Sequence, residues 1–361
     1  MRSAMLPMFL LCASLLLNGC ATDHRDARAP LAPGQVESTA MSRAAVLPVE
    51  VKARILALDA ERVTDGEVRG LLAQTPAPQV INIHGGIFPI KSGMNSFAQF
   101  LIGMGYPEAS LRNPGNGSYT YGYYDHCAEI AGAAAWYYER DGLRPMIVGH
   151  SQGGIQVIRV LHTLAGDFAT NVPVWNPLTE RAEERHEIID PWTGTKRPVV
   201  GVRVAFATAA VAGGLARLLP NQWDMNSRLR EIPDSVEEFT GFQKGFDFAG
   251  GDFGGYGIGN DYHATGRAIV RNVRLPSACG HSSIPYANTL LKNQEMADWI
   301  RNYQPLGPAA DAVEPDPMFG LKSARVLWAA EVWHGIKKHW VLELQRAIRA
   351  KQNRATTNAS L

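Results

Sequence analysis

The most reactive pattern in this sequence is a serine framed by glycines, in the motif G-H-S-Q-G-G at 149–154. The motif follows the apolar run 146–148 directly. A serine in a G-x-S-x-G pattern between a buried strand and a helix lies on a sharp turn, with its hydroxyl exposed at the strand end. The glycines two positions before and two positions after the serine crowd each other, so a Cβ there would clash. The motif therefore predicts Ser151 as a nucleophile.

The flanking residues have the periods of regular elements. Residues 145–148 are typical of a buried strand, and apolar residues recur every three or four positions from 152 to 165. Gly166 follows, where a glycine commonly ends a helix. A glycine-rich turn between a strand and a helix, without chemistry, is the alternative interpretation.

Strand-like and helix-like segments alternate along the rest of the chain. The sequence predicts strands at 79–83, 145–148, 202–207, 246–249 and 268–275. It predicts helices at 94–104, 123–140, 152–165 and 288–303. Such alternation is typical of a parallel sheet covered by helices on both faces, which is an α/β fold.

The order of these features resembles the α/β-hydrolase family. The resemblance covers about residues 75–305: a strand followed by HGG, a helix, a strand followed by GHSQGG and a helix, then a strand, an Asp loop, a strand, a His loop and a helix. It implies the α/β-hydrolase fold, a mostly parallel central sheet with helices on both faces and lid-like insertions. It also implies catalytic residues in the order Ser, Asp, His.

A serine hydroxyl needs an imidazole to accept its proton, and the imidazole needs a carboxylate to orient it. His281 lies in the loop after the strand at 268–275, where the resemblance implies the catalytic histidine. His263 is the alternative, but it precedes that strand.

Three aspartates are candidates for the carboxylate. We expect Asp252, because it follows the predicted strand 246–249 and a Gly-Gly turn. Asp247 ranks second because the same prediction places it inside the strand, and Asp261 ranks third. Loop aspartates also commonly cap their own backbone turns, so each of them has an alternative role without catalysis.

The oxyanion of an acyl-transfer reaction needs two backbone N–H donors. Gln152 follows the serine and is expected to supply one of them at the start of the helix. The turn after the strand at 79–83 is expected to supply the other, from Gly86 or Ile87. The resemblance to the HG motifs of lipases and esterases supports this choice.

The N-terminus is typical of an exported protein. Residues 1–19 have the charge and the short apolar core of a signal peptide. The stretch that ends at Cys20 resembles the lipobox of bacterial lipoproteins, which implies a lipid-anchored Cys20 in the cell envelope. Ala21 after it suggests the outer membrane, and an ordinary secretory signal is the alternative. Residues 20–47 are expected to form a flexible tether.

The remaining chain divides into a body at 48–317 and a tail at 318–361. Segments at about 167–200 and 215–234 are longer than simple connections, and the resemblance implies that they cover the active site. Peripheral packing is the alternative for both. The tail has eight Lys or Arg residues and two Glu in an amphipathic helical pattern. We expect it to pack on its own domain, with a membrane-surface role as the alternative.

Composition narrows the possible ligands. Without Arg2 the 35 basic residues become 34, equal to the 34 acidic ones, so the charge does not suggest a nucleic acid partner. The sequence shows no Cys/His cluster with metal-ligand spacing and no phosphate-binding glycine loop, so we expect no metal and no cofactor. Cys127 and Cys279 could form a disulfide or remain two buried thiols.

Together these features predict a lipid-anchored serine hydrolase that cleaves carboxylic esters through an acyl-enzyme. Its substrate would be a small-molecule or lipid ester with an apolar acyl group, and it would contact the membrane through the lipid anchor. A serine amidase and an acyltransferase of the same fold are alternatives. A catalytically silent binding protein of the cell envelope is the alternative from a different class.

Overall fold

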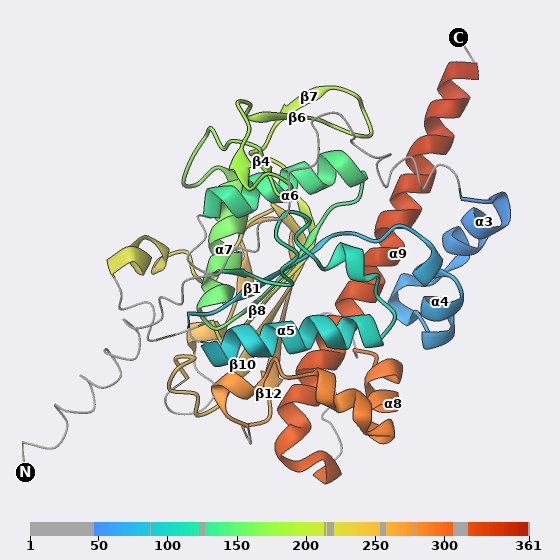
Figure 1. The fold of residues 1–361 in the computed structure, drawn as a ribbon. Coiled ribbons are helices and arrows are strands. Elements are labelled where there is room, and N and C mark those ends of the chain that lie inside the picture. The colour runs from blue at the N-terminus through green and yellow to red at the C-terminus, as the bar shows by residue number, and fades with distance from the viewer. Residues whose placement is uncertain are drawn as a thin grey trace, which may run out of the picture.

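The computed structural model describes residues 47–86, 88–122, 127–212, 214, 220–252, 258–277, 279–305 and 317–359. Their central element is a sheet of six parallel strands in the order β12-β10-β8-β3-β1-β2, with helices on both faces (Figure 1). The strands of this sheet are β1 (Val80–His84), β2 (Tyr121–Gly122), β3 (Met146–His150), β8 (Val204–Ala210), β10 (Val236–Lys244) and β12 (Ile269–Leu275). The predicted α/β class with a parallel sheet is confirmed.

The other elements are helices and three small two-stranded sheets. The α-helices are α3 (Val49–Ala57), α4 (Asp65–Gly70), α5 (Phe88–Gly103), α6 (Cys127–Asp141), α7 (Gln152–Ala165), α8 (Gln294–Asn302) and α9 (Ser323–Ala359). The short strands are β4 (Trp175–Asn176), β5 (Arg181–Ala182), β6 (Glu187–Ile189), β7 (Lys196–Pro198), β9 (Glu231–Ile232) and β11 (His263–Ala264).

Two apolar cores lie on opposite faces of the sheet. Side chains alternate between the faces along each strand, so Met146 and Val148 of β3 join one core while Ile147 joins the other. The first core includes α5, α8 and α9, and the second includes α6 and α7 (Figure 1). The central strands are therefore buried on both sides, as the apolar run 146–148 predicts.

All five pairings in the central sheet are parallel. The carboxyl ends of the strands consequently meet at one edge, and ligands of open α/β sheets bind at that edge. The loops that leave β1, β3, β8, β10 and β12 are therefore neighbours there, although more than 190 residues separate the first from the last.

Most sequence-predicted elements are present, and one is misplaced. The strand predicted at 246–249 is wrong, because those residues are in a turn and the strand is β10, which ends at Lys244. Helix α5 begins six residues before the predicted start at 94. The helix predicted at 288–303 is divided at Asn293, whose side chain caps α8 by accepting a hydrogen bond from the Met296 N–H.

The first predicted insertion packs against helices α6 and α7. Residues 167–200 contain the β4–β5 and β6–β7 hairpins, of which β4 and β6 contact α6. Phe168, which precedes the hairpins, packs against His162 in the C-terminal half of α7. Because α7 begins beside Ser151 and His162 lies near its other end, this contact is far from the serine along the helix. These contacts fit peripheral packing, the alternative interpretation. In the second insertion residues 215–219 lie outside the described residues, and Met225, Leu229 and Ile232 are buried in the α6–α7 core.

The tail forms the predicted long helix, α9, and it packs on the domain. The residues of its predicted apolar face are all at most 3% exposed: Val326, Ala330, Trp333, Ile336, Trp340, Leu344 and Ile348. Two of its buried carboxylates also meet arginines of the sheet layer, Glu331 with Arg271 and Glu343 with Arg144. The apolar face is therefore already occupied and is not available to a membrane.

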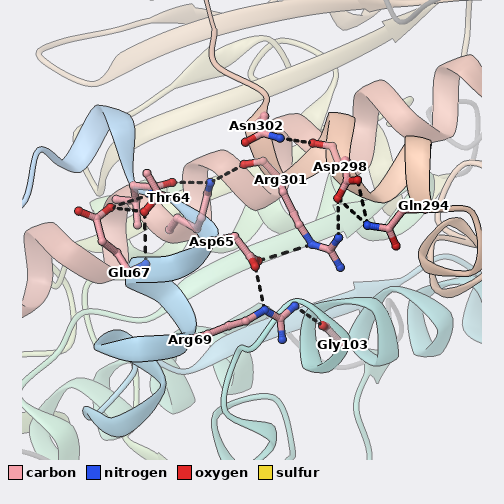
Figure 2. A network of polar contacts seen from close by, with 11 residues as sticks. Thr64, Asp65, Glu67, Arg69, Gly103, Gln294, Asp298, Arg301 and Asn302 are labelled. Atoms are coloured by element: carbon pink, nitrogen blue, oxygen red, sulfur yellow. Dashed lines mark hydrogen bonds and ion pairs between the residues drawn. The ribbon is translucent and has the colours of Figure 1, made fainter.

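The segment before β1 is joined to the body by ion pairs. Figure 2 shows Asp65 of α4 between Arg69 of the same helix and Arg301 of α8. Arg69 also donates to the Gly103 carbonyl at the end of α5. The helix itself begins with a capping box, in which Thr64 and Glu67 exchange hydrogen bonds. Residues from Thr64 onward therefore belong to the same packed domain as the sheet.

The predicted signal peptide, Cys20 and nearly all of the tether lie outside the described residues. Among the helices of the described part, none is long and apolar enough to cross a membrane.

Candidate active site

Ser151 lies on the tight turn that the glycine pattern predicts. It is the single residue between β3 and α7, with φ 57° and ψ −129°. For a residue with a Cβ, such a backbone conformation costs about 1–3 kcal/mol. Its N–H donates to the Ala210 carbonyl at the end of β8 at 2.9 Å, which holds the turn against the sheet.

The two glycines around Ser151 are sterically required. A Cβ at Gly149 would lie 2.5 Å from the Gly153 carbonyl oxygen, and a Cβ at Gly153 would lie 2.2 Å from that of Ile83. Both distances are far inside van der Waals contact with backbone atoms, which cannot move away cheaply. The strand-to-helix turn therefore depends on glycine at both positions, for the reason that the sequence pattern indicates.

The structure brings Ser151, His281 and Asp247 together from three loops. His281 Nε2 lies 2.9 Å from Ser151 Oγ, and its Nδ1 lies 2.8 Å from Asp247 Oδ2. Both distances are those of good hydrogen bonds. His281 is in the loop after β12, as expected, and Asp247 is in the loop after β10. In this arrangement the imidazole can take a proton from the hydroxyl while the carboxylate holds its other nitrogen.

The choice of Asp252 as the partner of His281 is wrong, because the structure places Asp247 there. The cause is the misplaced strand. With β10 ending at Lys244, Asp247 is already in the loop that leaves the sheet edge. Asp252 is fully buried, and its Oδ2 accepts hydrogen bonds from Asn260 Nδ2 at 3.2 Å and from the Lys244 N–H at 3.4 Å. Asp261 is exposed at the start of the next segment.

The carboxylate of Asp247 is held in its charged form. Burial raises the pKa of the Asp247 carboxyl, but the hydrogen bonds and positive charges around it, those of His281 first among them, together outweigh burial, so its pKa lies below the ordinary value. The Gly250 N–H also donates to Asp247 Oδ1 at 3.0 Å. Hydrogen bonds to the charged form favour it. Asp247 can therefore accept from the Nδ1–H of His281 while remaining a carboxylate.

His150 is a neighbour of the site that the sequence analysis treated only as a motif position. Its ring is fully buried, lies 5.0 Å from the His281 ring between centroids, and has no hydrogen-bond partner at either nitrogen among the described residues. Burial, and then the nearby His281, lowers the pKa of His150 well below its ordinary value. His150 is thus a neutral group that adds no charge beside His281. The G-H-S pattern is the only sequence signal that points to it.

The three expected oxyanion donors differ in their surroundings. Gln152 is the first residue of α7, so its backbone N–H is among those without an acceptor inside the helix. The Gly86 N–H donates to the side-chain Oε1 of Gln152 at 3.1 Å and is therefore occupied. Ile87 lies outside the described residues. The start of α7 carries the partial positive charge that an oxyanion needs.

The two cysteines of the body and the alternative histidine take no part in the site. Cys127 and Cys279 are both free thiols, so no disulfide braces the His281 loop. His263, the alternative histidine, lies in the β9–β11 ladder and is exposed. Within the described ranges, no group of three or more His, Cys, Asp or Glu residues could hold a metal ion.

Comparison with models of protein families and with curated proteins finds no match for this chain.

Proposed function

We propose that this protein is a serine hydrolase of the α/β-hydrolase fold that cleaves carboxylic esters through an acyl-enzyme on Ser151. The observation that carries the proposal is the unbroken relay from Ser151 Oγ through the His281 ring to Asp247 Oδ2. The three residues come from loops that are distant in sequence and meet only at the carboxyl edge of the sheet. They follow each other along the chain in the order Ser, Asp, His.

The geometry supports a two-step reaction. Ser151 Oγ attacks the ester carbonyl while His281 Nε2 takes the hydroxyl proton, and the negative charge forms beside the start of α7. His281 then gives this proton to the leaving alcohol, and the acyl group stays on Ser151. A water molecule attacks the acyl-enzyme by the same route, with His281 again as base and then as acid. Asp247 keeps the Nδ1–H of His281 in place throughout.

The surface beside the site supports an apolar substrate group. Phe246 and Phe248 flank Asp247 in the loop after β10 and are 73% and 57% exposed. Phe88, at the start of α5 next to the turn after β1, is 76% exposed. Phe246 and Phe248 are in the loop after β10, and Phe88 begins the helix after β1, so all three lie near the carboxyl edge of the sheet. Exposed aromatic side chains in such a place are suited to contact an apolar part of a ligand.

Amide hydrolysis, acyl transfer and a catalytically silent binding protein are the alternatives to ester cleavage. Amide hydrolysis and acyl transfer use the same relay. Ester cleavage is proposed over amide cleavage because an alcohol is a better leaving group than an amine, and acyl transfer differs from hydrolysis only in the nucleophile that attacks the acyl-enzyme. A catalytically silent protein gains nothing from the strained backbone of Ser151 or from a buried Asp247 aligned on His281. Backbone strain of this kind commonly accompanies functional sites.

The experiment that tests the proposal is covalent labelling of residues 22–361 with a fluorophosphonate probe, followed by mass spectrometry of the adduct. We expect one adduct on Ser151 that disappears in Ser151→Ala and in His281→Ala. Ser283→Ala is the matched control, because Ser283 is two residues from His281 but its hydroxyl donates to the Gly280 carbonyl and not to the relay. Folded protein that fails to react would contradict the proposal. Hydrolysis rates on p-nitrophenyl esters of increasing acyl length then test the apolar substrate.

We also propose that Cys20 is lipidated and anchors the protein in the outer membrane of a bacterial cell envelope. The support is the N-terminal sequence alone, with a short apolar core that ends at a cysteine. Incorporation of radiolabelled palmitate that is lost in Cys20→Ser is the expected result. Equal incorporation into both proteins would show that the cysteine is not the lipid site.

A further inference from the structure

Asn260 is a buried asparagine whose side chain uses all of its hydrogen-bonding capacity. It is 2% exposed and lies at the end of the short helical turn Ile258–Asn260. Its Oδ1 accepts from the Ala212 N–H at 3.0 Å and from the Tyr262 hydroxyl at 3.1 Å. Its Nδ2 donates to the Gly250 carbonyl at 2.8 Å and to Asp252 Oδ2 at 3.2 Å. An amide offers two donors and two acceptor lone pairs, and here all four are engaged.

Two of these bonds lead to the loop that carries Asp247. Asn260 Nδ2 holds Gly250 through its carbonyl, and the N–H of Gly250 donates to Asp247 Oδ1 at 3.0 Å. The same Nδ2 holds Asp252 through its carboxylate, and the N–H of Asp252 donates to the Asp247 carbonyl at 2.9 Å. Asn260 is therefore linked to the Asp247 side chain through Gly250 and to the Asp247 backbone through Asp252, by two hydrogen bonds in each case.

The hydrogen bond from the Ala212 N–H to Asn260 Oδ1 connects Asn260 to the loop after β8, which lies beside the Ser151 turn. Ala212 follows β8, and its Cβ and Cα pack within 3.4 Å of where a Cβ of Gly154 would lie in the first turn of α7. Ala210, two residues earlier, accepts the hydrogen bond from the Ser151 N–H. The loop that Asn260 Oδ1 holds is thus the one on which Ser151 and the start of α7 rest.

We propose that Asn260 is a positioning residue, which sets the Asp247 loop against the Ser151 turn so that Asp247 Oδ2 meets His281. This inference rests on the proposed function, because it assigns a role within the same relay. Asn260 needs no contact with substrate for this role. It needs an acceptor toward Ala212 and a donor toward Gly250 and Asp252, which an amide supplies and a carboxylate of the same shape does not.

Asn260→Asp is the variant that tests the role. The change keeps the acceptor toward Ala212 but replaces the donor by a second carboxylate oxygen, facing the Gly250 carbonyl and the Asp252 carboxylate. We expect kcat to fall by about 10²-fold with KM nearly unchanged, the size of loss that accompanies a small misplacement of a catalytic group. Asn272→Ala is the matched control. Asn272 also anchors Tyr262, at 3.0 Å and 2.8 Å, but does not touch the Asp247 loop, so kcat should be retained.

A second variant covers the case in which Asn260→Asp does not fold. Gln243 Nε2 donates to the Asn260 main-chain carbonyl at 3.1 Å. Gln243→Met removes that bond and keeps the length of the side chain, so we expect a smaller loss of kcat in the same direction. If a folded variant at either position keeps the kcat of the wild type, the positioning role is wrong.

A double-mutant cycle separates positioning from a general structural effect. Because Asn260 acts through Asp247, Asn260→Asp should cause no further loss of kcat when Asp247 is already Asn. An equal loss in both backgrounds would overturn the inference, because it would show that Asn260 acts by another route.

The inference can also fail or hold separately from the proposed function. The proton on His281 Nδ1 gives a separate low-field NMR signal while it is bonded to Asp247, and this signal does not require turnover. We expect the signal in the wild type and in Asn272→Ala, and its shift or loss in Asn260→Asp. An unchanged signal in Asn260→Asp rejects the positioning role. Absence of labelling at Ser151 in the wild type rejects the hydrolase function instead.

Discussion

Replacing Asp247 with asparagine should disable the relay with almost no change in its shape. Asp247 Oδ2 lies 2.8 Å from His281 Nδ1, and the side chain is 4% exposed, so an amide of the same size would occupy the same place. A carboxylate can only accept at that distance, which keeps the proton on Nδ1 and leaves Nε2 free to take one from Ser151. The asparagine Nδ2 would donate to Nδ1 and leave the proton on Nε2, pointing at the serine hydroxyl.

The magnitude follows from that exchange of roles. With a proton already on Nε2, His281 cannot accept one from Ser151 Oγ at 2.9 Å. The loss of the correct tautomer in a Ser-His-Asp relay lowers kcat by about 10⁴-fold, which corresponds to about 5 kcal/mol in the activation free energy. Binding of substrate does not involve the buried carboxylate, so KM should change little.

The assay compares Asp247→Asn and Asp252→Asn on one p-nitrophenyl ester, with the rate of fluorophosphonate labelling as a second readout. Asp252 is the matched control because it is an aspartate of the same loop that accepts from Asn260 and from Lys244. An asparagine at position 252 retains an acceptor oxygen, so we expect kcat of Asp252→Asn to fall by less than tenfold. Circular dichroism and thermal unfolding check that both variants fold. A larger loss in Asp252→Asn than in Asp247→Asn would refute the reasoning.

Three further predictions concern stability, measured by urea unfolding. Gly335→Ala in α9 would place a Cβ 2.3 Å from the buried ring of Phe206, so we expect the free energy of unfolding to fall by about 1–3 kcal/mol. Gly66 in α4 is exposed, and a Cβ there would have its nearest neighbouring atom at 4.0 Å. Gly66→Ala should therefore raise the free energy of unfolding by up to about 1 kcal/mol. Burial raises the pKa of Glu238, but His339 and Lys338 outweigh burial and lower it to about 2. Because the pKa of Glu238 is lower in the folded than in the unfolded state, its charge stabilises the protein above pH 4.5, and this stabilisation is lost as the pH falls toward 2. The difference in unfolding free energy between the wild type and Glu238→Gln should therefore shrink by about 3 kcal/mol between pH 4.5 and pH 2. A constant difference would contradict the assignment.

Local sterics make the Ser151 turn predictable from the sequence. The clash that a Cβ would meet at Gly149 or Gly153 involves backbone only a few residues away or on the neighbouring strand. Any chain that makes this turn needs glycine there, so the motif carries the information by itself. His281 was also predictable, because β12 is a clear strand with polar and apolar residues in alternation, and the loop after it contains one histidine.

The partner of His281 was not predictable in the same way, although a signal existed. Val236–Lys244 carries Val, Phe and Thr at strand-like spacing and could have been recognised as β10. The apolar residues Phe246 and Phe248 suggest a strand at 246–249 instead, but they are exposed in a turn. The sequence alone does not distinguish a hydrophobic side chain buried in a strand from one exposed in a loop at the carboxyl edge of the sheet. The end of β10 decides which aspartate faces His281.

The sequence by itself determined the α/β class, the Ser151 turn and the long helix at the C-terminus, because each depends on residues within one or two turns of the chain. Only the tertiary structure decided that Asp247 rather than Asp252 meets His281. It also decided that residues 167–200 pack on α6, and that α9 is buried against the sheet. These outcomes depend on where a strand ends and on which surfaces remain uncovered after the sheet forms. Such information is spread over residues that are distant in the sequence, 34 positions apart for Asp247 and His281 and 199 positions apart for Arg144 and Glu343.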